Sequence, residues 1–385
     1  MKQVYFDNAA TTRVRPEVVE LMNKVMLEDY GNPSSRHILG MHAEQYLKTA
    51  AEQIAACLKV RPAEIVFNSG GTEGNNTALI GTALARKAYG RHIISTNIEH
   101  AAVYKPLEFL ESLGYEITIV GVDHQGMIDQ EALRAAIRPD TILVSTMWVN
   151  NEMGAIEDIA HIGAMIKEIN PKTYFHTDAI QAFGKLTLRP KDAKVDMLTV
   201  SSHKIHGPKG VGFMYIRDGV RLNPLIYGGG QQKDRRSGTQ DVPGIAGMGL
   251  AAEMYRKEHA EIEAKMLSVK DRLIDRLEAM EGVTVNSQRG ALSAPHVVSA
   301  SFAGVRAEVL LHALEDKGIY VSSGSACSSN HPAISGTLQA IGVPKELLDS
   351  TLRFSFGIYN EPEEADYTAD CIEELLPELR KFRRY

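Results

Sequence analysis

The sequence predicts an α/β protein in which helices cover a mostly parallel sheet, followed by a smaller α+β unit. Three observations support this fold class. Apolar runs typical of buried strands alternate with helical stretches over about the first two hundred residues. A glycine-rich turn joins an early strand to the helix after it. From about residue 250 the pattern changes to a long charged helix and shorter strands.

The first part begins with two helices, expected at residues 16–29 and 42–58. Apolar side chains recur on one stripe of the former, and Pro16 stands in its first turn. A third helix is expected at 73–88, after the strand 64–67. Continuous apolar character predicts further buried strands at 92–95, 116–120, 141–147, 173–177 and 195–200. The helices between these strands are expected at 101–113, 129–137 and 156–169.

The second part reads as a smaller unit packed beside the first. Its expected elements are a long charged helix at 247–280, strands at 283–285 and 297–302, and helices at 306–317 and 363–381. No linker rich in proline and serine precedes it, so we expect the long helix to bridge the two units. The predicted large domain covers residues 16–255, and the small domain covers 1–15 with 256–385.

Composition excludes several classes of protein. A chain of 385 residues with 44% hydrophobic residues can bury a full core, which argues against a disordered or fibrous protein. The formal charge of −6 gives no global attraction for nucleic acid. No apolar run reaches the roughly 20 residues that a membrane helix needs. Three cysteines without metal-type spacing exclude a disulfide framework and a CxxC zinc site. The N-terminus shows no leader pattern, so we expect a cytoplasmic enzyme.

A glycine-rich turn follows the strand at 64–67. The segment 68–76, NSGGTEGNN, places two glycines and a threonine before a helix, where free backbone N–H groups can bind a phosphate. A tight turn with Thr72 as the helix N-cap is an equally good interpretation. The segment matches neither the dinucleotide fingerprint nor the nucleoside-triphosphate loop, so the usual nucleotide folds are not supported.

Two charged side chains follow later strands of the predicted sheet. Asp178 comes after 173–177, and Lys204 follows 195–200. Taken alone, Asp178 can be interpreted as the N-cap of the next helix. Lys204 alone can be interpreted as the partner of an acidic side chain or as a contact to a phosphate. Because strand ends share one crevice, the turn, the acid and the lysine together match the needs of pyridoxal phosphate. The lysine would form an imine, the acid would keep the pyridine nitrogen protonated, and the turn would hold the phosphate.

Histidines near these strand ends have several interpretations. His100 also follows a strand and could stack on the cofactor ring, although a histidine at a helix start is more often a cap. His203 and His206 have a spacing seen in metal sites, but no carboxylate or cysteine accompanies them, so no metal is expected.

Cys327 stands in a run rich in serine and glycine, VSSGSACSSN, which is typical of an exposed loop. An exposed thiol in such a loop is a candidate nucleophile or redox group. The alternative is a surface cysteine without a role. Cys57 and Cys371 lie in helical patterns and are interpreted as packing residues.

With these motifs in one order, the sequence resembles the class V aminotransferase-fold cysteine desulfurases, the NifS/IscS-like enzymes. The SSGSAC form is similar to their group I. Ser202 and Asn68 differ from the glycine and threonine of many relatives, which removes no group that the chemistry needs. The motifs that carry the resemblance are YFDNAATT at 5–12, GNPSSRH at 31–37, SGGTE at 69–73, EH at 99–100, VNNE at 149–152, DAIQ at 178–181, SSHK at 201–204, RSGT at 236–239, SSGSAC at 322–327 and LRFS at 352–355.

The resemblance implies fold type I of the pyridoxal-phosphate-dependent transferases, with a seven-stranded sheet and a catalytic loop at about 322–337 in the small domain. It also implies a role for each matching position. Lys204 would bind the cofactor and shuttle the substrate's α-proton, and His100 would stack on the ring and assist proton transfer. The remaining contacts would be Asp178 to the ring nitrogen, Gln181 to the phenolic oxygen, Gly71, Thr72, Ser201 and His203 to the phosphate with Thr239 of the other subunit, and Asn151 and Arg353 to the substrate carboxylate.

The implied reaction converts L-cysteine to L-alanine and transfers the sulfur to Cys327 as a persulfide. The implied partners are a second copy of the chain and a sulfur acceptor such as an iron–sulfur scaffold. Three alternatives remain: a selenocysteine lyase, an aminotransferase in which Cys327 is idle, and a sulfur-assembly scaffold that only binds partners. The products formed from cysteine, and the absorbance of bound cofactor, separate them.

Overall fold

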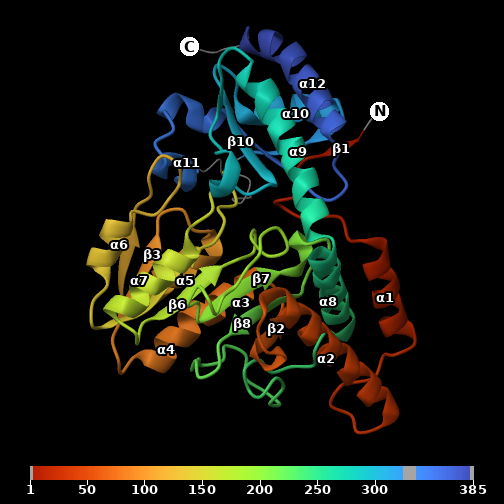
Figure 1. Cartoon of the computed structure of the whole chain (residues 1–385), viewed down its shortest axis with the longest axis vertical. Coiled ribbons are helices and arrows are strands. Elements are labelled where there is room, and N and C mark those ends of the chain that lie inside the picture. Colours follow the sequence, from red (N-terminus) through yellow and green to blue (C-terminus); the bar gives the residue numbers. More distant parts are fainter. Residues whose placement is uncertain (1–2, 324–334, 382–385) are drawn as a thin grey trace.

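The computed structural model describes residues 3–323 and 335–381. Cys327 and most of the loop expected around it lie outside these ranges. In the described part, a seven-stranded sheet forms the centre of the large unit (Figure 1). The sheet confirms the predicted α/β class with a mostly parallel arrangement.

Six strands of the large sheet share one direction. The strand order is β2-β8-β7-β6-β5-β3-β4, and β8 runs antiparallel to both of its neighbours. The carboxyl ends of the other six therefore meet at one edge. The strands are β2 (Ile65–Asn68), β3 (His92–Thr96), β4 (Glu116–Val120), β5 (Thr141–Met147), β6 (Tyr174–Asp178), β7 (Met197–Ser201) and β8 (Gly212–Ile216).

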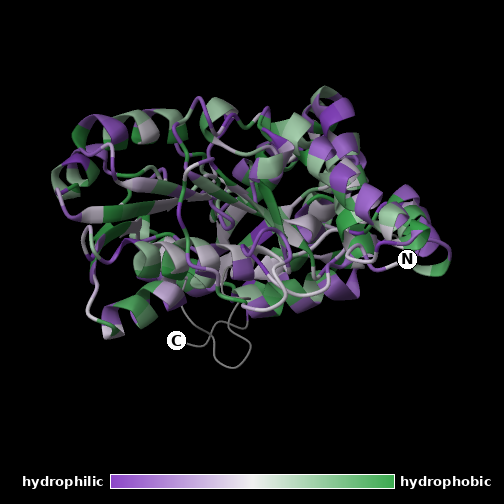
Figure 2. Cartoon of the chain, turned by 90° about the horizontal axis from the view of Figure 1, so that it is seen from below, coloured by the Kyte–Doolittle hydropathy of each residue, from purple (hydrophilic) through white to green (hydrophobic). Residues whose placement is uncertain are grey.

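Helices cover both faces of this sheet, as Figure 2 shows from below. Neighbouring residues of one strand enter different cores: Ile93 packs with α5, whereas Ile94 belongs to the core formed with α2, α7 and α8. Burial on both faces explains why these strands read as continuous apolar runs. The helices of this part are α1 (Pro16–Leu27), α2 (Ile38–Leu58), α3 (Gly71–Asn76), α4 (Thr82–Arg86), α5 (Ala101–Ser112), α6 (Gln130–Ala136), α7 (Ile159–Ile169) and α8 (Val242–Lys257).

The second unit is built on a four-stranded antiparallel sheet of order β12-β13-β10-β9 and a two-stranded parallel pair, β1 with β11. The pairing of β1 brings the N-terminal segment to the C-terminal part of the chain (Figure 1). The two-domain division stays a prediction. The elements are β1 (Val4–Tyr5), α9 (His259–Glu278), β9 (Val283–Val285), β10 (Val297–Phe302), α10 (Ala307–Asp316), β11 (Ile319–Tyr320), β12 (Ser322–Ser323), α11 (Gly336–Ala340), β13 (Thr351–Ser355) and α12 (Pro362–Arg380).

Two expected helices differ from the sequence prediction. The helix expected at 247–280 is two helices, α8 and α9, interrupted at Glu258, whose φ of −101° and ψ of 10° are not helical. At this break, Arg15 Nη2 and Glu258 Oε2 form an ion pair of 2.7 Å. The helix expected at 73–88 contains a π-helical stretch, Thr77–Gly81, between α3 and α4. Within the described part of the chain, no helix has the length and apolar character needed to span a membrane.

Candidate active site

Side chains from both sheets surround a cavity of about 460 Å³ at the carboxyl ends of β6 and β7. Two predicted residues are not found there: Thr239 is exposed and does not line the cavity, and Cys327 lies outside the described residues. The structure brings the other predicted site residues together. Those that line the cavity are Gly71, Thr72, His100, Asn151, Asp178, Gln181, Ser201, His203, Lys204 and Arg353.

Asp178 is the last residue of β6 and is 5% exposed. Its Oδ2 accepts a hydrogen bond of 2.7 Å from Asn75 Nδ2, and its Oδ1 accepts one of 3.0 Å from the Ile180 amide. Burial raises the pKa of Asp178, and these two bonds oppose the rise. A cationic ligand nitrogen next to the carboxylate would offset the cost of burying it.

Lys204 ends the 3-10 turn that follows β7. Its Nζ donates hydrogen bonds of 2.5 Å and 2.6 Å to the carbonyl oxygens of Ala9 and Ala10. Behind it, the buried Lys185 donates from Nζ to the Lys204 carbonyl oxygen at 2.8 Å, and burial lowers the pKa of Lys185 to about 7. The N-terminal segment thus lies against the amine that the sequence singled out.

Two histidines face the cavity with defined hydrogen bonds. His100 is the N-cap of α5, and its Nδ1 accepts a hydrogen bond of 3.0 Å from the Ala102 amide. It is therefore both a helix cap and a residue of the site. His203 Nδ1 lies 3.2 Å from Thr11 Oγ1. Burial, with the positive charge of Lys204, lowers the pKa of His203 to about 4, so its ring is neutral at physiological pH.

The turn between β2 and α3 forms one wall of the cavity. Gly70 has a φ of +141°, which disfavours any side chain. A Cβ on the adjacent Gly212 of β8 would lie 2.7 Å from the Cα of Gly70, so this glycine permits the close approach. The first N–H groups of α3 have no intrahelical acceptors. Together with the hydroxyls of Thr72 and Ser201, they offer donors to an anion.

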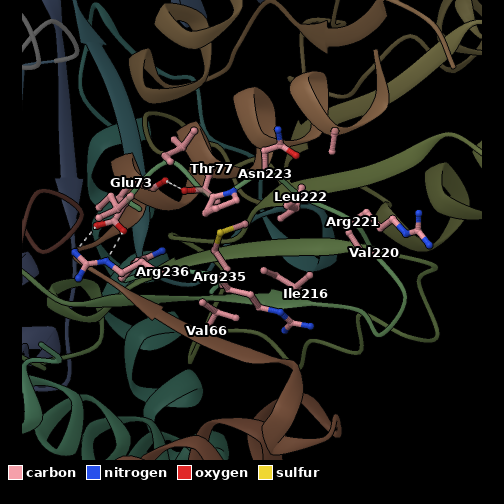
Figure 3. A pocket seen from close by; sticks show the side chains of 16 residues that line it. Val66, Glu73, Thr77, Ile216, Val220, Arg221, Leu222, Asn223, Arg235 and Arg236 are labelled. Carbon is pink, nitrogen blue, oxygen red and sulfur yellow. Dashed lines mark hydrogen bonds and ion pairs between the residues drawn. The ribbon is translucent and has the colours of Figure 1, made fainter. Parts of the chain in front are cut away.

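The same turn is tied to the segment that carries Thr239. Figure 3 shows a second cavity, of about 380 Å³, lined by β2, β8 and residues 220–226. At its edge Arg236 Nε lies 3.0 Å from Glu73 Oε1, in an ion pair that is drawn in the figure. Glu73 Oε2 also accepts a hydrogen bond of 2.9 Å from the Ser69 amide. The RSGT segment is therefore anchored beside the turn, although Thr239 does not line this chain's own cavity.

Arg353, on the four-stranded sheet, also lines the cavity. It lies on β13, and its Nη2 forms an ion pair of 3.0 Å with Asp7 Oδ1 while its Nη1 donates to the Asn151 carbonyl oxygen at 3.0 Å. Its Nε is buried without a hydrogen-bond partner among the described residues. A guanidinium at the wall of the cavity suits a carboxylate ligand.

The sequence reasoning missed several residues of the site. Asn75, Asp7, Lys185 and His296 contact the predicted residues, although no role was predicted for them. Asp7 stands in the quoted N-terminal motif, and Asn75 follows the glycine-rich turn, so both had a local signal. A buried lysine has none, because lysine is normally exposed. Over the ranges that the structure describes, no group of three or more histidine, cysteine or acidic side chains could hold a metal ion.

Known proteins resemble this chain over nearly its whole length. The sequence profile of the class-V aminotransferases matches residues 4–368. The chain is 42% identical over 385 residues to "Cysteine desulfurase IscS" of Dictyoglomus turgidum, covering 100% of this chain and 97% of the relative. It is 43% identical over 381 residues to "Putative cysteine desulfurase IscS 1" of Bacillus subtilis, covering 97% and 100%.

Solved structures agree with these relatives. A structure named "NIFS-LIKE PROTEIN" superposes with a TM-score of 0.93 at 39% identity, covering 98% of this chain and 100% of its own. One named "SspA in complex with cysteine" superposes with a TM-score of 0.82 at 34% identity, covering 93% and 100%. On its fold, its site and these similarities, the chain belongs to the class-V aminotransferase family.

Proposed function

We propose that the protein is a pyridoxal-phosphate-dependent cysteine desulfurase, which converts L-cysteine to L-alanine and transfers the sulfur to Cys327. The observation that carries this proposal is the single cavity in which the lysine, the buried acid, the anion-binding turn and Arg353 meet. Curated relatives more than 40% identical over at least 97% of the chain bear the name cysteine desulfurase, which supports the same reaction.

The residues of the cavity fit pyridoxal phosphate. Asp178 is a buried carboxylate that lacks a cationic partner in its hydrogen bonds, and the protonated ring nitrogen would supply one. Gly71, Thr72, Ser201 and His203 would hold the phosphate, and Lys204 would form the covalent bond to the cofactor. His100 would stack on the ring, and Gln181 would donate to its phenolic oxygen. Bound pyridoxal phosphate supplies an electron sink for a carbanion at the substrate's α-carbon.

The substrate would be held by its carboxylate. Arg353 and Asn151 both line the cavity, and the guanidinium of Arg353 can form a charge-assisted hydrogen bond with a carboxylate. Lys204 would remove the α-proton, because its amine and the substrate share this small volume. His100 would assist proton transfer at the substrate thiol.

The sulfur step would use the thiolate of Cys327, since a thiolate rather than a thiol is the nucleophile. A sulfur–sulfur bond forms on Cys327 while the carbon–sulfur bond of the substrate breaks. The β-carbon keeps the electron pair and is protonated, which leaves alanine. Neither other cysteine suits this role: burial raises the pKa of Cys57 to about 11 and also raises the pKa of Cys371.

The functional unit would be a homodimer in which Thr239 completes the phosphate site of the partner subunit. Thr239 is exposed and lies outside its own cavity, yet its segment is anchored at the turn by the pair of Arg236 and Glu73. The segment 27–41 also exposes large apolar side chains, and exposed apolar surface can mark an interface. The side chains of this segment that are more than half exposed are Leu27, Tyr30, Ile38 and Met41. Sedimentation of a monomer that retains bound cofactor at nanomolar concentration would refute this arrangement.

The sulfur would pass from Cys327 to an acceptor protein, such as an iron–sulfur scaffold, in the cytoplasm. Incubation with isotopically labelled cysteine and mass spectrometry of the proteins that gain sulfur tests this part. The central test is product analysis with the cofactor-loaded protein and L-cysteine. We expect equimolar alanine and, with a thiol reductant, sulfide. Amino transfer that requires a keto acid, or activity with selenocysteine alone, would refute the proposal.

A further inference from the structure

His296 does not line the cavity, but its side chain contacts a residue that does, Gln181. His296 is fully buried, just before β10, and its Nε2 lies 3.1 Å from Gln181 Oε1. No motif quoted for the family resemblance contains His296.

The surroundings decide which way the Gln181 amide points. Its Nε2 lies 3.0 Å from the Ala9 carbonyl oxygen, which can only accept a hydrogen bond. With Nε2 on that side, Oε1 faces His296, and the histidine must donate. If the amide were flipped, Gln181 Oε1 would face the Ala9 carbonyl oxygen, and neither oxygen could donate a hydrogen bond. Only the orientation with Nε2 toward the Ala9 carbonyl oxygen satisfies both contacts.

The charges around His296 determine its protonation state. Burial lowers the pKa of His296 well below its usual value, and the positive charges of Lys185, Lys270, Arg353 and Lys204 lower it further. The ring is therefore neutral and carries its proton on Nε2, which donates to Gln181. Its Nδ1 is buried and has no hydrogen-bond partner among the described residues. The one N–H group of this imidazole therefore donates its hydrogen bond to Gln181 Oε1.

We propose that His296 is a positioning residue that holds the Gln181 amide so that its nitrogen, and not its oxygen, serves the ligand in the cavity. The Nε2 of Gln181 carries two hydrogens, of which the Ala9 carbonyl takes one. The described residues offer the other no acceptor, so it is available to an oxygen of the bound group. The proposal rests on the proposed function, in which that oxygen is the phenolic oxygen of pyridoxal phosphate.

The expected effect is on the acidity of the bound cofactor. A donor at the ring oxygen lowers the affinity of that oxygen for a proton. Losing this donor should raise the pH midpoint at which the bound cofactor changes its absorbance. One hydrogen bond to a charged oxygen corresponds to an upward shift of about one to two pH units, or about ten- to hundredfold in the proton equilibrium.

The test is a spectroscopic pH titration of the cofactor-loaded protein without substrate. His296→Leu removes the N–H group that donates to Gln181 Oε1. His296→Gln keeps an N–H donor on a side chain of similar length. His92→Leu is the matched control, because His92 is equally buried but opens β3 at the far end of the sheet from the cavity, paired with Thr141 and Thr118. His296→Leu should shift the midpoint upward, His296→Gln should restore it, and His92→Leu should leave it unchanged. If His296→Leu does not fold, the shorter His296→Asn should give the same shift.

A double-mutant cycle with Gln181→Leu separates positioning from general damage. In that background, His296→Leu should produce no further shift, because the amide through which it acts is gone. An unchanged midpoint in both His296→Leu and His296→Asn would overturn the inference and leave the proposed function standing. An equal shift with and without Gln181 would do the same. A wild-type protein that binds no coloured pyridoxal phosphate would overturn both.

Discussion

Replacing Glu99 with glutamine should make the stability of the protein less dependent on pH. Glu99 lies in the loop after β3, is 6% exposed, and accepts hydrogen bonds on Oε1 from Thr96 Oγ1 at 2.7 Å and the Met147 amide at 2.9 Å. Its Oε2 is buried with no partner among the described residues. Burial raises its pKa to about 8, with a smaller contribution from the charge of Asp178. Glutamine has the shape of the protonated acid and cannot ionise.

The magnitude follows from the two pKa values. Glu99 has a pKa of about 8 in the folded protein, against an ordinary value of 4.5. Between these values it is protonated when the protein is folded and ionised when the protein is unfolded. The unfolded chain then binds fewer protons, and the free energy of unfolding falls as pH rises, by about 1.4 kcal/mol per pH unit. The contribution of protonated Glu99 to the free energy of unfolding is fully present below about pH 4.5 and is lost as the pH rises to about 8. Between about pH 5.5 and about pH 7.5 the loss is about 3 kcal/mol.

Urea denaturation at these pH values, with equal protein and cofactor concentrations, measures the effect. Glu99→Gln should lose less stability across the window, by up to about 3 kcal/mol relative to wild type. Some decline should remain, because burial also raises the pKa of Glu157 to about 8. Glu131→Gln, at an exposed position in the first turn of α6, is the control and should follow wild type. Parallel curves for Glu99→Gln and wild type would refute the reasoning.

Three further predictions concern the site. Gly212→Ala would place a Cβ 2.5 Å from the Val200 carbonyl oxygen and 2.7 Å from Gly70 Cα. We therefore expect a stability loss of about 1–3 kcal/mol and weaker cofactor binding. An unchanged melting temperature and an unchanged Kd for the cofactor would contradict this. Arg353→Lys replaces the planar guanidinium by a single ammonium group, so KM for cysteine should rise about tenfold with a smaller change in kcat. An unaltered KM would argue against binding of the substrate carboxylate by Arg353. Cys57→Ser should retain alanine production and Cys327→Ser should abolish it, and equal rates in both variants would exclude Cys327 as the sulfur acceptor.

Local patterns determined most of the architecture. Strands buried on both faces read as continuous apolar runs, so β5 at 141–147 was predicted with its observed bounds. The strand ends then identified Asp178 and Lys204, because a parallel sheet must bring its carboxyl ends together. No sign of the break at Glu258 was visible in the sequence, because the charged helical pattern continues through it. Arg15, the ion-pair partner of Glu258, is distant in the chain.

The sequence by itself determined the fold class, the family resemblance and the chemical groups of the site. Only the tertiary structure decided how those groups are held. Arg353 reaches Asp7 across 346 positions of the chain, and His296 reaches Gln181 across 115. Contacts over such separations leave no local periodicity, because they form only when both sheets and the N-terminal segment have assembled. The protonation of buried groups such as Glu99 and Lys185 depends on the same assembly, since burial, which folding alone creates, is the main cause of their shifted pKa values.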